Sequence, residues 1–75
     1  MSNKKNLFVT FYTTAEAMAT EEACKSRKIE GRLVPVPRAL SAGCGISWKG
    51  NSEDKDITEK ALREEDIEWE ELALL

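Results

Sequence analysis

The stretch that most constrains the fold of this chain is Asn6–Tyr12, which reads NLFVTFY. Most of its residues are β-branched or aromatic, as is typical of a β-strand. Alternate side chains of a strand point to opposite faces, and here both faces would be mostly apolar. The two sets are Leu7, Val9 and Phe11 on one face and Phe8, Thr10 and Tyr12 on the other. A strand that is apolar on both faces is expected in the middle of a sheet.

Two helices are predicted, over about residues 15–28 and 53–65, because apolar residues recur there at helical spacing. Each follows a residue whose side chain can accept a hydrogen bond from the first turn. For the first helix this N-cap is Thr13 or Thr14, and we prefer Thr14 because an acidic residue then lies in the first turn. The second helix is predicted to begin after Ser52, which two acidic residues follow.

The helical spacing also predicts which side chains face the core. In the first helix this face is Ala17, Met18 and Cys24, and a weaker second stripe is Ala15, Ala19 and Ala23. In the second helix the predicted face is Ile57, Ala61 and Leu62. Glu21 falls among the core positions of the first helix, so it is either solvated at the rim or paired with a cation, and we prefer the solvated rim.

Three further strands are expected, over about residues 32–36, 46–49 and 67–72. The order is then β-α-β-β-α-β, which a ferredoxin-like α+β sandwich satisfies compactly, with four antiparallel strands and both helices on one face. We expect a single domain over residues 1–75, with flexible ends at 1–6 and 73–75.

The composition fits a small globular protein and argues against several functions. Hydrophobic residues make up 41% and charged residues 33% of the chain. No apolar run is long enough to span a bilayer and no signal peptide is evident, so we expect a soluble cytoplasmic protein without membrane contact. Cysteines of cytoplasmic proteins are usually free thiols. Two cysteines and no histidine argue against a metal site, and we expect no cofactor.

Charge is unevenly distributed along the chain. Residues 1–50 contain eight Lys/Arg and four Asp/Glu, a net charge of +4, whereas residues 51–75 contain three and ten, a net charge of −7. We prefer the simpler interpretation, an acidic solvated helix and tail, over the alternative of an acidic docking face for a basic partner protein. No continuous basic stripe accompanies the aromatic residues, so we expect no nucleic-acid binding.

The segment 35–45, PVPRALSAGCG, has residue choices that look chemical rather than structural. Two prolines stiffen its entry. Cys44 lies between two glycines, which permit positive φ and the close approach of another molecule. Arg38 in the segment and Arg32 just before it would favour the thiolate, which is the reactive form of a cysteine. We therefore predict that Cys44 is a reachable and reactive thiol.

Three motifs in the chain resemble those of a known family. They are FxTTxxA over residues 11–17, GRLVPVPR over 31–38 and SAGCG over 41–45. Together they are similar to the small bacterial family of selenium/sulfur carrier-like proteins, over about residues 7–70. The resemblance implies that the Cys44 thiol carries the sulfur or selenium. We expect a cysteine desulfurase-type donor and a downstream acceptor protein as its partners.

A sulfur carrier needs a nucleophilic thiol and surroundings that stabilise a persulfide anion. A glycine-flanked loop with nearby arginines and convergent backbone N–H groups supplies both. The residues expected to bind at this site are Arg32, Arg38, Ser41, Gly43 and Gly45. The chemistry alone leaves a non-covalent ligand-binding or protein-interaction module equally open, and the family resemblance favours the carrier. Sulfur versus selenium, and a homo-oligomer versus a monomer, are left open.

Cys24 is expected to be a structural residue. It falls on the predicted buried face of a helix, where a free cysteine behaves as a small hydrophobe. Resolving an oxidised Cys44 is the functional alternative, which we disfavour because the helix would have to move. A hydrolase is also disfavoured, since no histidine is present to activate Ser41 or Cys44. The sequence thus favours a carrier over a complete enzyme.

Overall fold

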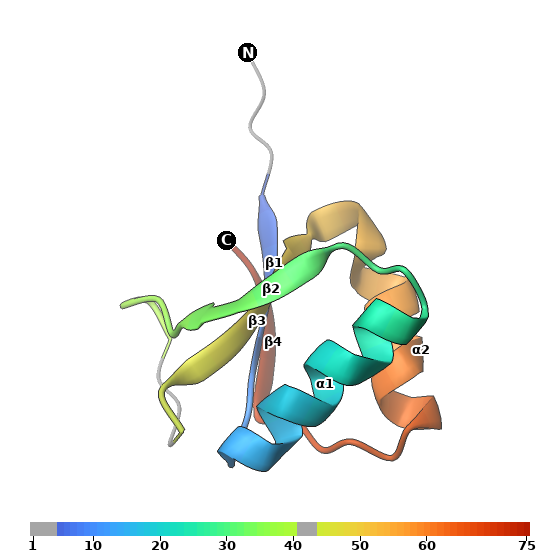
Figure 1. Ribbon diagram of the computed structural model, residues 1–75. Helices are drawn as coiled ribbons and strands as arrows, with labels where there is room; N and C mark the ends of the chain where they lie inside the picture. Colours follow the sequence, from blue (N-terminus) through green and yellow to red (C-terminus); the bar gives the residue numbers. More distant parts are fainter. Residues whose placement is uncertain (1–4, 41–43) are drawn as a thin grey trace.

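The computed structural model describes residues 5–40 and 44–75, and it has the predicted order of elements (Figure 1). The elements are β1 (Asn6–Thr10), α1 (Thr14–Ser26), β2 (Gly31–Pro35), β3 (Ile46–Asn51), the 3₁₀ helix η1 (Ser52–Asp54), α2 (Lys55–Glu64) and β4 (Glu71–Leu74). The strands form one antiparallel sheet in the order β2-β3-β1-β4. The central place predicted for β1 and the ferredoxin-like α+β fold are therefore confirmed.

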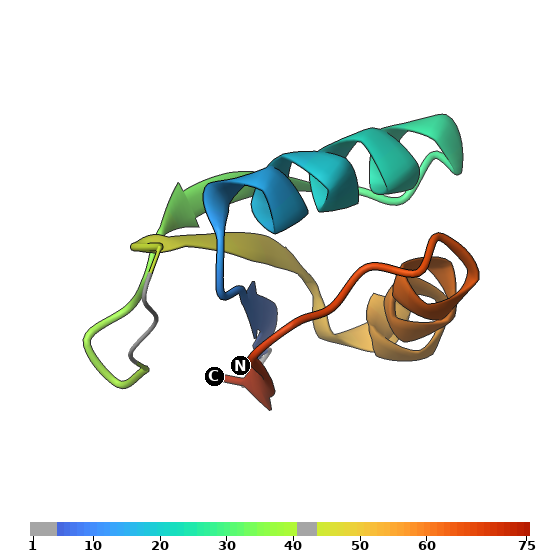
Figure 2. The same ribbon diagram turned by 90° about the horizontal axis from the view of Figure 1, so that it is seen from below.

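Both helices pack on the same face of the sheet, where the core lies (Figure 2). The sheet contributes a row of cross-strand neighbours, one from each strand: Leu33, Trp48, Val9 and Leu72. The helices contribute Ala17, Cys24, Ala61 and Leu62. Trp48 lies at the centre of this core and is only 2% exposed. A side chain at Gly31 would overlap its indole ring, so glycine at that position makes room for the tryptophan.

The start of each helix differs from the prediction. The N-cap of α1 is Thr13, and Thr14 is the first helical residue. The Thr13 hydroxyl accepts a hydrogen bond from the Glu16 N–H at 3.3 Å, and the Glu16 carboxylate accepts one from the Thr13 N–H at 3.2 Å. This reciprocal capping box satisfies two backbone donors at once, which Thr14 as a cap would not do. Ser52 is no N-cap of α2, because it lies within η1, an extra turn that precedes α2.

Two predicted core residues are exposed instead. The side chain of Met18 is 57% exposed and that of Ile57 is 51% exposed. Thr20 on α1 and Thr58 on α2, which were not predicted to face the core, are buried. Successive residues of a helix are about 100° apart around its axis. An error of one position in the predicted stripe therefore turns the predicted core face away from the observed one. The buried side chains on the inner face of α1 are all small, and the longer Met18 lies outside this face. Glu21 is exposed, in agreement with the preferred rim position.

Both helices end in the same motif, which explains why the last strand was predicted too early. Lys28 and Asp66 have positive φ angles of 59° and 57°. Each is followed by an isoleucine whose N–H returns to a helix carbonyl, Ile29 to Cys24 at 2.8 Å and Ile67 to Leu62 at 2.8 Å. This is the Schellman arrangement, in which an apolar residue closes the helix end. Ile67 is therefore half-buried as the closing residue of α2, and not as part of a strand over 67–72.

The last strand runs to Leu74 and completes the sheet. Trp69, expected in this strand, precedes it and lies under the Arg63 guanidinium, 5.8 Å from the ring centroid. Ala73 and Leu74, predicted to belong to a flexible end, pair with β1 instead. Leu75 extends the pairing through hydrogen bonds of 2.6 and 2.9 Å with Asn6. Within the described ranges, no helix has the length and apolar character needed to cross a bilayer.

Candidate functional site

The candidate site lies where the chain leaves β2 and returns into β3. The two strands finish their pairing with Pro35 opposite Ile46, and the Val36 N–H then donates to the Gly45 carbonyl at 3.2 Å. Residues 36–40 project beyond the sheet and contain a turn closed by the Leu40 N–H and the Pro37 carbonyl at 3.0 Å (Figures 1 and 2). Cys44 therefore lies at the base of this loop, next to the last rung of the β2–β3 ladder.

The Cys44 side chain is half-buried and packs against the edge of the core. Its thiol donates a hydrogen bond to the main-chain carbonyl of Ile46, with 3.2 Å between Sγ and the oxygen. Gly45 beside it is exposed, has a φ of 77° and has open space where a side chain would be. A residue with a side chain would be strained at this φ. Gly45 thus makes the turn into β3 and adds no side chain beside Cys44.

Cys24 has a different environment. It lies on the inner face of α1 and is fully buried. Burial raises the pKa of the Cys24 thiol to about 11, and the nearby positive charge of Arg27 opposes this only in part. A thiol with such a pKa is almost entirely protonated near neutral pH and is a weak nucleophile. The structure therefore supports the prediction that Cys24 is a core residue.

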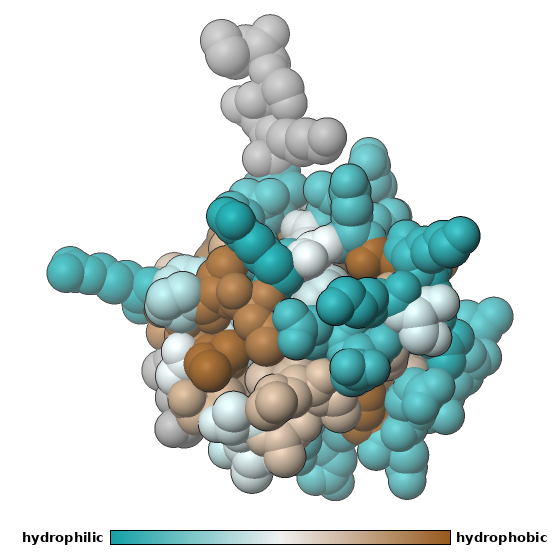
Figure 3. Space-filling view, in the orientation of Figure 1, coloured by the Kyte–Doolittle hydropathy of each residue, from teal (hydrophilic) through white to brown (hydrophobic). Residues whose placement is uncertain are grey.

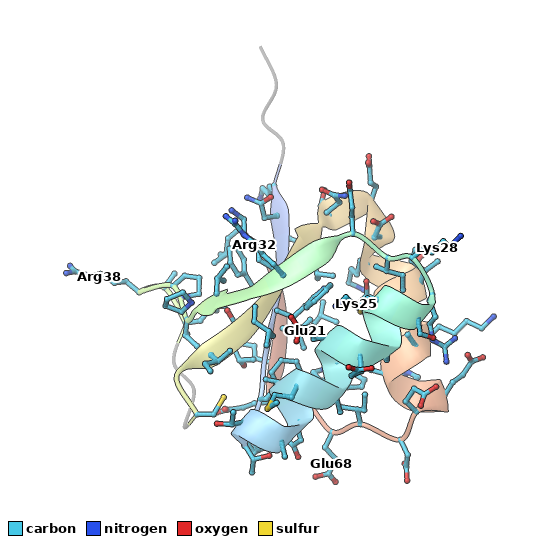
Figure 4. The ribbon with its side chains drawn as sticks, viewed as in Figure 1. Glu21, Lys25, Lys28, Arg32, Arg38 and Glu68 are labelled. Carbon is cyan, nitrogen blue, oxygen red and sulfur yellow. The ribbon has the colours of Figure 1, made fainter. Side chains whose placement is uncertain are left out.

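The two arginines predicted to activate Cys44 lie apart from each other. Figure 4 shows Arg38 extending from the loop into open space, away from the body of the molecule. Arg32 lies on β2, three residues before Pro35, which is about 10 Å along a strand. Neither forms an ion pair or a side-chain hydrogen bond with any residue that the structure describes. Their effect on the thiolate stays a prediction. Ser41 and Gly43 lie outside the described residues, so their binding roles stay predictions too.

An apolar hollow next to Cys44 was not predicted from the sequence. It has a volume of about 290 Å³ and is lined by Leu33, Val34, Pro35, Gly45 and Ile46. A hydrophobic patch is visible over this end of β2 in Figure 3. The alternation of Val and Pro in the loop entry was the available signal, because it places apolar side chains at a strand edge. In the described part of the chain, no group of three or more His, Cys, Asp or Glu residues could hold a metal ion.

The fold and the site together define a small ferredoxin-like α+β domain that presents one partly accessible thiol at the base of a loop. A family model described as "Putative Se/S carrier protein-like" matches residues 6–74. Since the match spans nearly the whole chain, the protein belongs to this family, as the three motifs predicted. Searches among curated proteins and among solved structures gave no match.

Proposed function

We propose that this protein carries sulfur or selenium on the Cys44 thiol, as a persulfide or perselenide, between a donor and an acceptor protein. The observation that carries the proposal is the contrast between the two cysteines: Cys44 is partly open at the base of a loop, whereas Cys24 is enclosed and its pKa is raised to about 11. Membership of the Se/S carrier family supports the same role. Such a carrier works where thiols are kept reduced, as in the cytoplasm.

The transfer is an exchange between a thiol and a persulfide, and it needs no oxidant because the donor persulfide already holds the sulfur at the required oxidation state. The Cys44 thiolate attacks the outer sulfur of a persulfide on the donor, here of the cysteine desulfurase type. A new S–S bond forms at Cys44 while the bond between the two donor sulfurs breaks. The donor leaves as a thiolate, which takes up the proton that Cys44 has lost. Delivery repeats this exchange, with an acceptor thiolate as the attacking group and Cys44 as the leaving group.

The surroundings of Cys44 fit these steps. The hydrogen bond from its thiol to the Ile46 carbonyl holds the resting side chain in place, and attack on a donor requires this bond to break. The open space at Gly45 provides a direction of approach for the donor sulfur. Arg38 extends into solvent, so we assign it to contact with the partner protein rather than with the sulfur.

The proposal is tested by loading the protein in vitro. The protein is incubated with a cysteine desulfurase, its cofactor and cysteine, and its intact mass is measured without reductant. We expect a gain of one sulfur atom that mild reductant removes. Cys44→Ser should abolish the gain, and Cys24→Ser, the matched control, should retain it. Absence of a gain with several desulfurases would contradict the proposal, as would a gain that survives in Cys44→Ser.

The hollow beside Cys44 makes non-covalent ligand binding the second candidate. Its volume of about 290 Å³ is near the lower limit of small-molecule sites. A ligand held there would raise the melting temperature equally in the wild type and in Cys44→Ser, because the thiol does not line the hollow. A stabilisation that depends on Cys44 would instead favour the carrier.

A further inference from the structure

A groove runs along α1, on the side of this helix that faces residues 65–69. Three adjoining hollows of about 510, 450 and 340 Å³ compose it, and Ile67 lines all three. The first opens between Tyr12 and Trp69, and the last ends at Ser26 near the end of α1. The groove therefore extends along most of the length of α1.

The lining of this groove combines apolar residues, which we call its floor, with acidic residues, which we call its rim. The alanines Ala15, Ala19 and Ala23, together with Ile67, line the floor, so the weaker stripe noted in the sequence faces this groove. The acidic residues along its sides are Glu16, Glu22, Glu65, Asp66 and Glu68. Figure 3 shows weakly hydrophobic surface over the first part of α1 and hydrophilic surface over the rest of this helix, and Figure 4 shows Glu68 reaching outward into solvent.

The charges on the rim are only partly compensated within the chain. Glu65 pairs with Arg27 at 2.9 Å, and Glu16 is occupied by the backbone N–H groups at the start of α1. Glu22, Asp66 and Glu68 form no ion pair with any residue in the described ranges. An occupant that complements this surface must be apolar toward the alanines and cationic at its sides. A basic amphipathic helix has this pattern, and small residues on one helix allow another backbone to approach closely.

The aromatic end of the groove and Cys44 lie at the same end of the sheet. Thr10 pairs with Ser47 on β3, and the Glu70 N–H donates to the Thr10 carbonyl at 2.7 Å. Thr10, Ser47 and Glu70 therefore mark one end of the sheet. Tyr12, Cys44 and Trp69 lie just outside the strands at this same end. A partner segment in the groove would thus be anchored beside the loop that holds the thiol.

We propose that this groove binds a basic amphipathic helical segment of the protein that exchanges sulfur with Cys44. We take this partner to be the sulfur donor, an assignment that rests on the proposed carrier function, whereas the binding of a basic amphipathic segment does not. The apolar floor supplies affinity, and the unpaired rim carboxylates select a cationic segment and accelerate its association.

Binding is tested with Cys44→Ser protein and two synthetic helical peptides of equal length, one of leucine and lysine and one of leucine and glutamate. Amide and indole NMR shifts report where each peptide binds. We expect the lysine peptide to shift signals along the groove, from Tyr12 and Trp69 to Ala23, with an affinity that falls as salt is added. Shifts concentrated elsewhere, or equal binding of the glutamate peptide, would overturn the proposal.

Two variants that raise the net charge equally distinguish binding in the groove from a general attraction between the acidic protein and the basic peptide. Ala19→Arg places a charged side chain on the floor and should weaken binding at least about tenfold. Glu53→Gln also raises the net charge by one, but on η1, away from the groove, and should change binding by less than about twofold. Equal weakening by the two variants would overturn the proposal. Glu22→Gln, which leaves the floor intact, should lower both the affinity and its salt dependence, and it keeps the test valid if Ala19→Arg fails to fold.

Loading experiments separate this proposal from the carrier function itself. In the protein with Cys44 intact, Ala19→Arg should slow sulfur loading by a desulfurase, while loading by a small-molecule persulfide should be unchanged. If neither donor loads the wild type, the carrier function fails and the peptide result still decides the groove. If both donors load Ala19→Arg as fast as the wild type, the groove is not the docking site and the carrier function stands.

Discussion

Cys24 and Cys44 are the two thiols of one small domain, yet they lie in opposite surroundings. Cys24 is enclosed between α1 and the sheet, and burial raises its pKa to about 11. Cys44 lies at the base of a loop, with its thiol on the Ile46 carbonyl and an exposed glycine beside it. The same side chain is thus a packing element in one place and a partly accessible thiol in the other. What differs is the backbone around it, a packed helix face against a loop that leaves the sheet.

Alkylation should show the largest difference between the two regions. With iodoacetamide near pH 8, we expect Cys44 to react at least about 100-fold faster than Cys24. A thiol with a pKa of about 11 has roughly 90-fold less thiolate at that pH than a thiol with the ordinary pKa of 9.0, and burial adds to this. Peptide mass mapping over time gives both rates in one sample. Comparable rates, or faster labelling of Cys24, would show that α1 opens readily and that the contrast is not real.

The fold could be predicted from the sequence because the spacing of apolar residues indicates which face of a strand or helix is buried. The alternation in Asn6–Tyr12 fixed β1 as a central strand, and helical spacing located both helices. The closing of α2 by Ile67 could not be predicted, because Asp66 adopts the left-handed conformation that glycine usually marks. Without that signal, Ile67 looked like the first residue of a strand.

The candidate site was predictable only in part, for a similar reason. Cys44 could be identified because glycines and prolines mark an exposed loop within the chain itself. The groove along α1 could not, because it depends on how residues 65–69 lie against a helix that is distant in sequence. Arg38 shows the limit of proximity in sequence, since it is close to Cys44 along the chain while its side chain extends into solvent.

A smaller but distinct effect is expected in the pH dependence of stability. Folding raises the pKa of Cys24 from 9.0 to about 11, so the native state holds this proton more tightly than the unfolded chain does. The resulting contribution to the free energy of unfolding is complete below pH 9 and is lost as the pH rises through about 11. The loss of this contribution between about pH 8 and about pH 10.5 amounts to about 2 kcal/mol, at about 1.4 kcal/mol per pKa unit.

Urea unfolding measures this loss. Cys44→Ser protein is compared with the double variant that also carries Cys24→Ala, so that lysines and the tyrosine, which titrate in the same range, contribute equally to both. The difference between their free energies of unfolding should shrink by about 2 kcal/mol over that pH range. A difference that stays constant with pH would mean that Cys24 is more hydrated than its complete burial indicates.

The smallest effect, and the one that sharpens the account of Cys44, concerns Arg38. Its position near Cys44 in the sequence predicted that it favours the thiolate, so that Arg38→Ala would slow alkylation. Because the Arg38 side chain extends into solvent, we expect instead that Arg38→Ala changes the alkylation rate by less than about twofold, since water and salt screen an exposed charge.

If Arg38 contacts the partner, loading by a desulfurase should slow by about threefold in Arg38→Ala, since charges at the edge of an interface act mainly on association. Lys25→Ala, which removes a cation from α1, is the control and should alter neither rate. Slower alkylation in Arg38→Ala alone would restore the sequence prediction and place the guanidinium at the sulfur in solution, whereas slower loading alone would assign Arg38 to the partner.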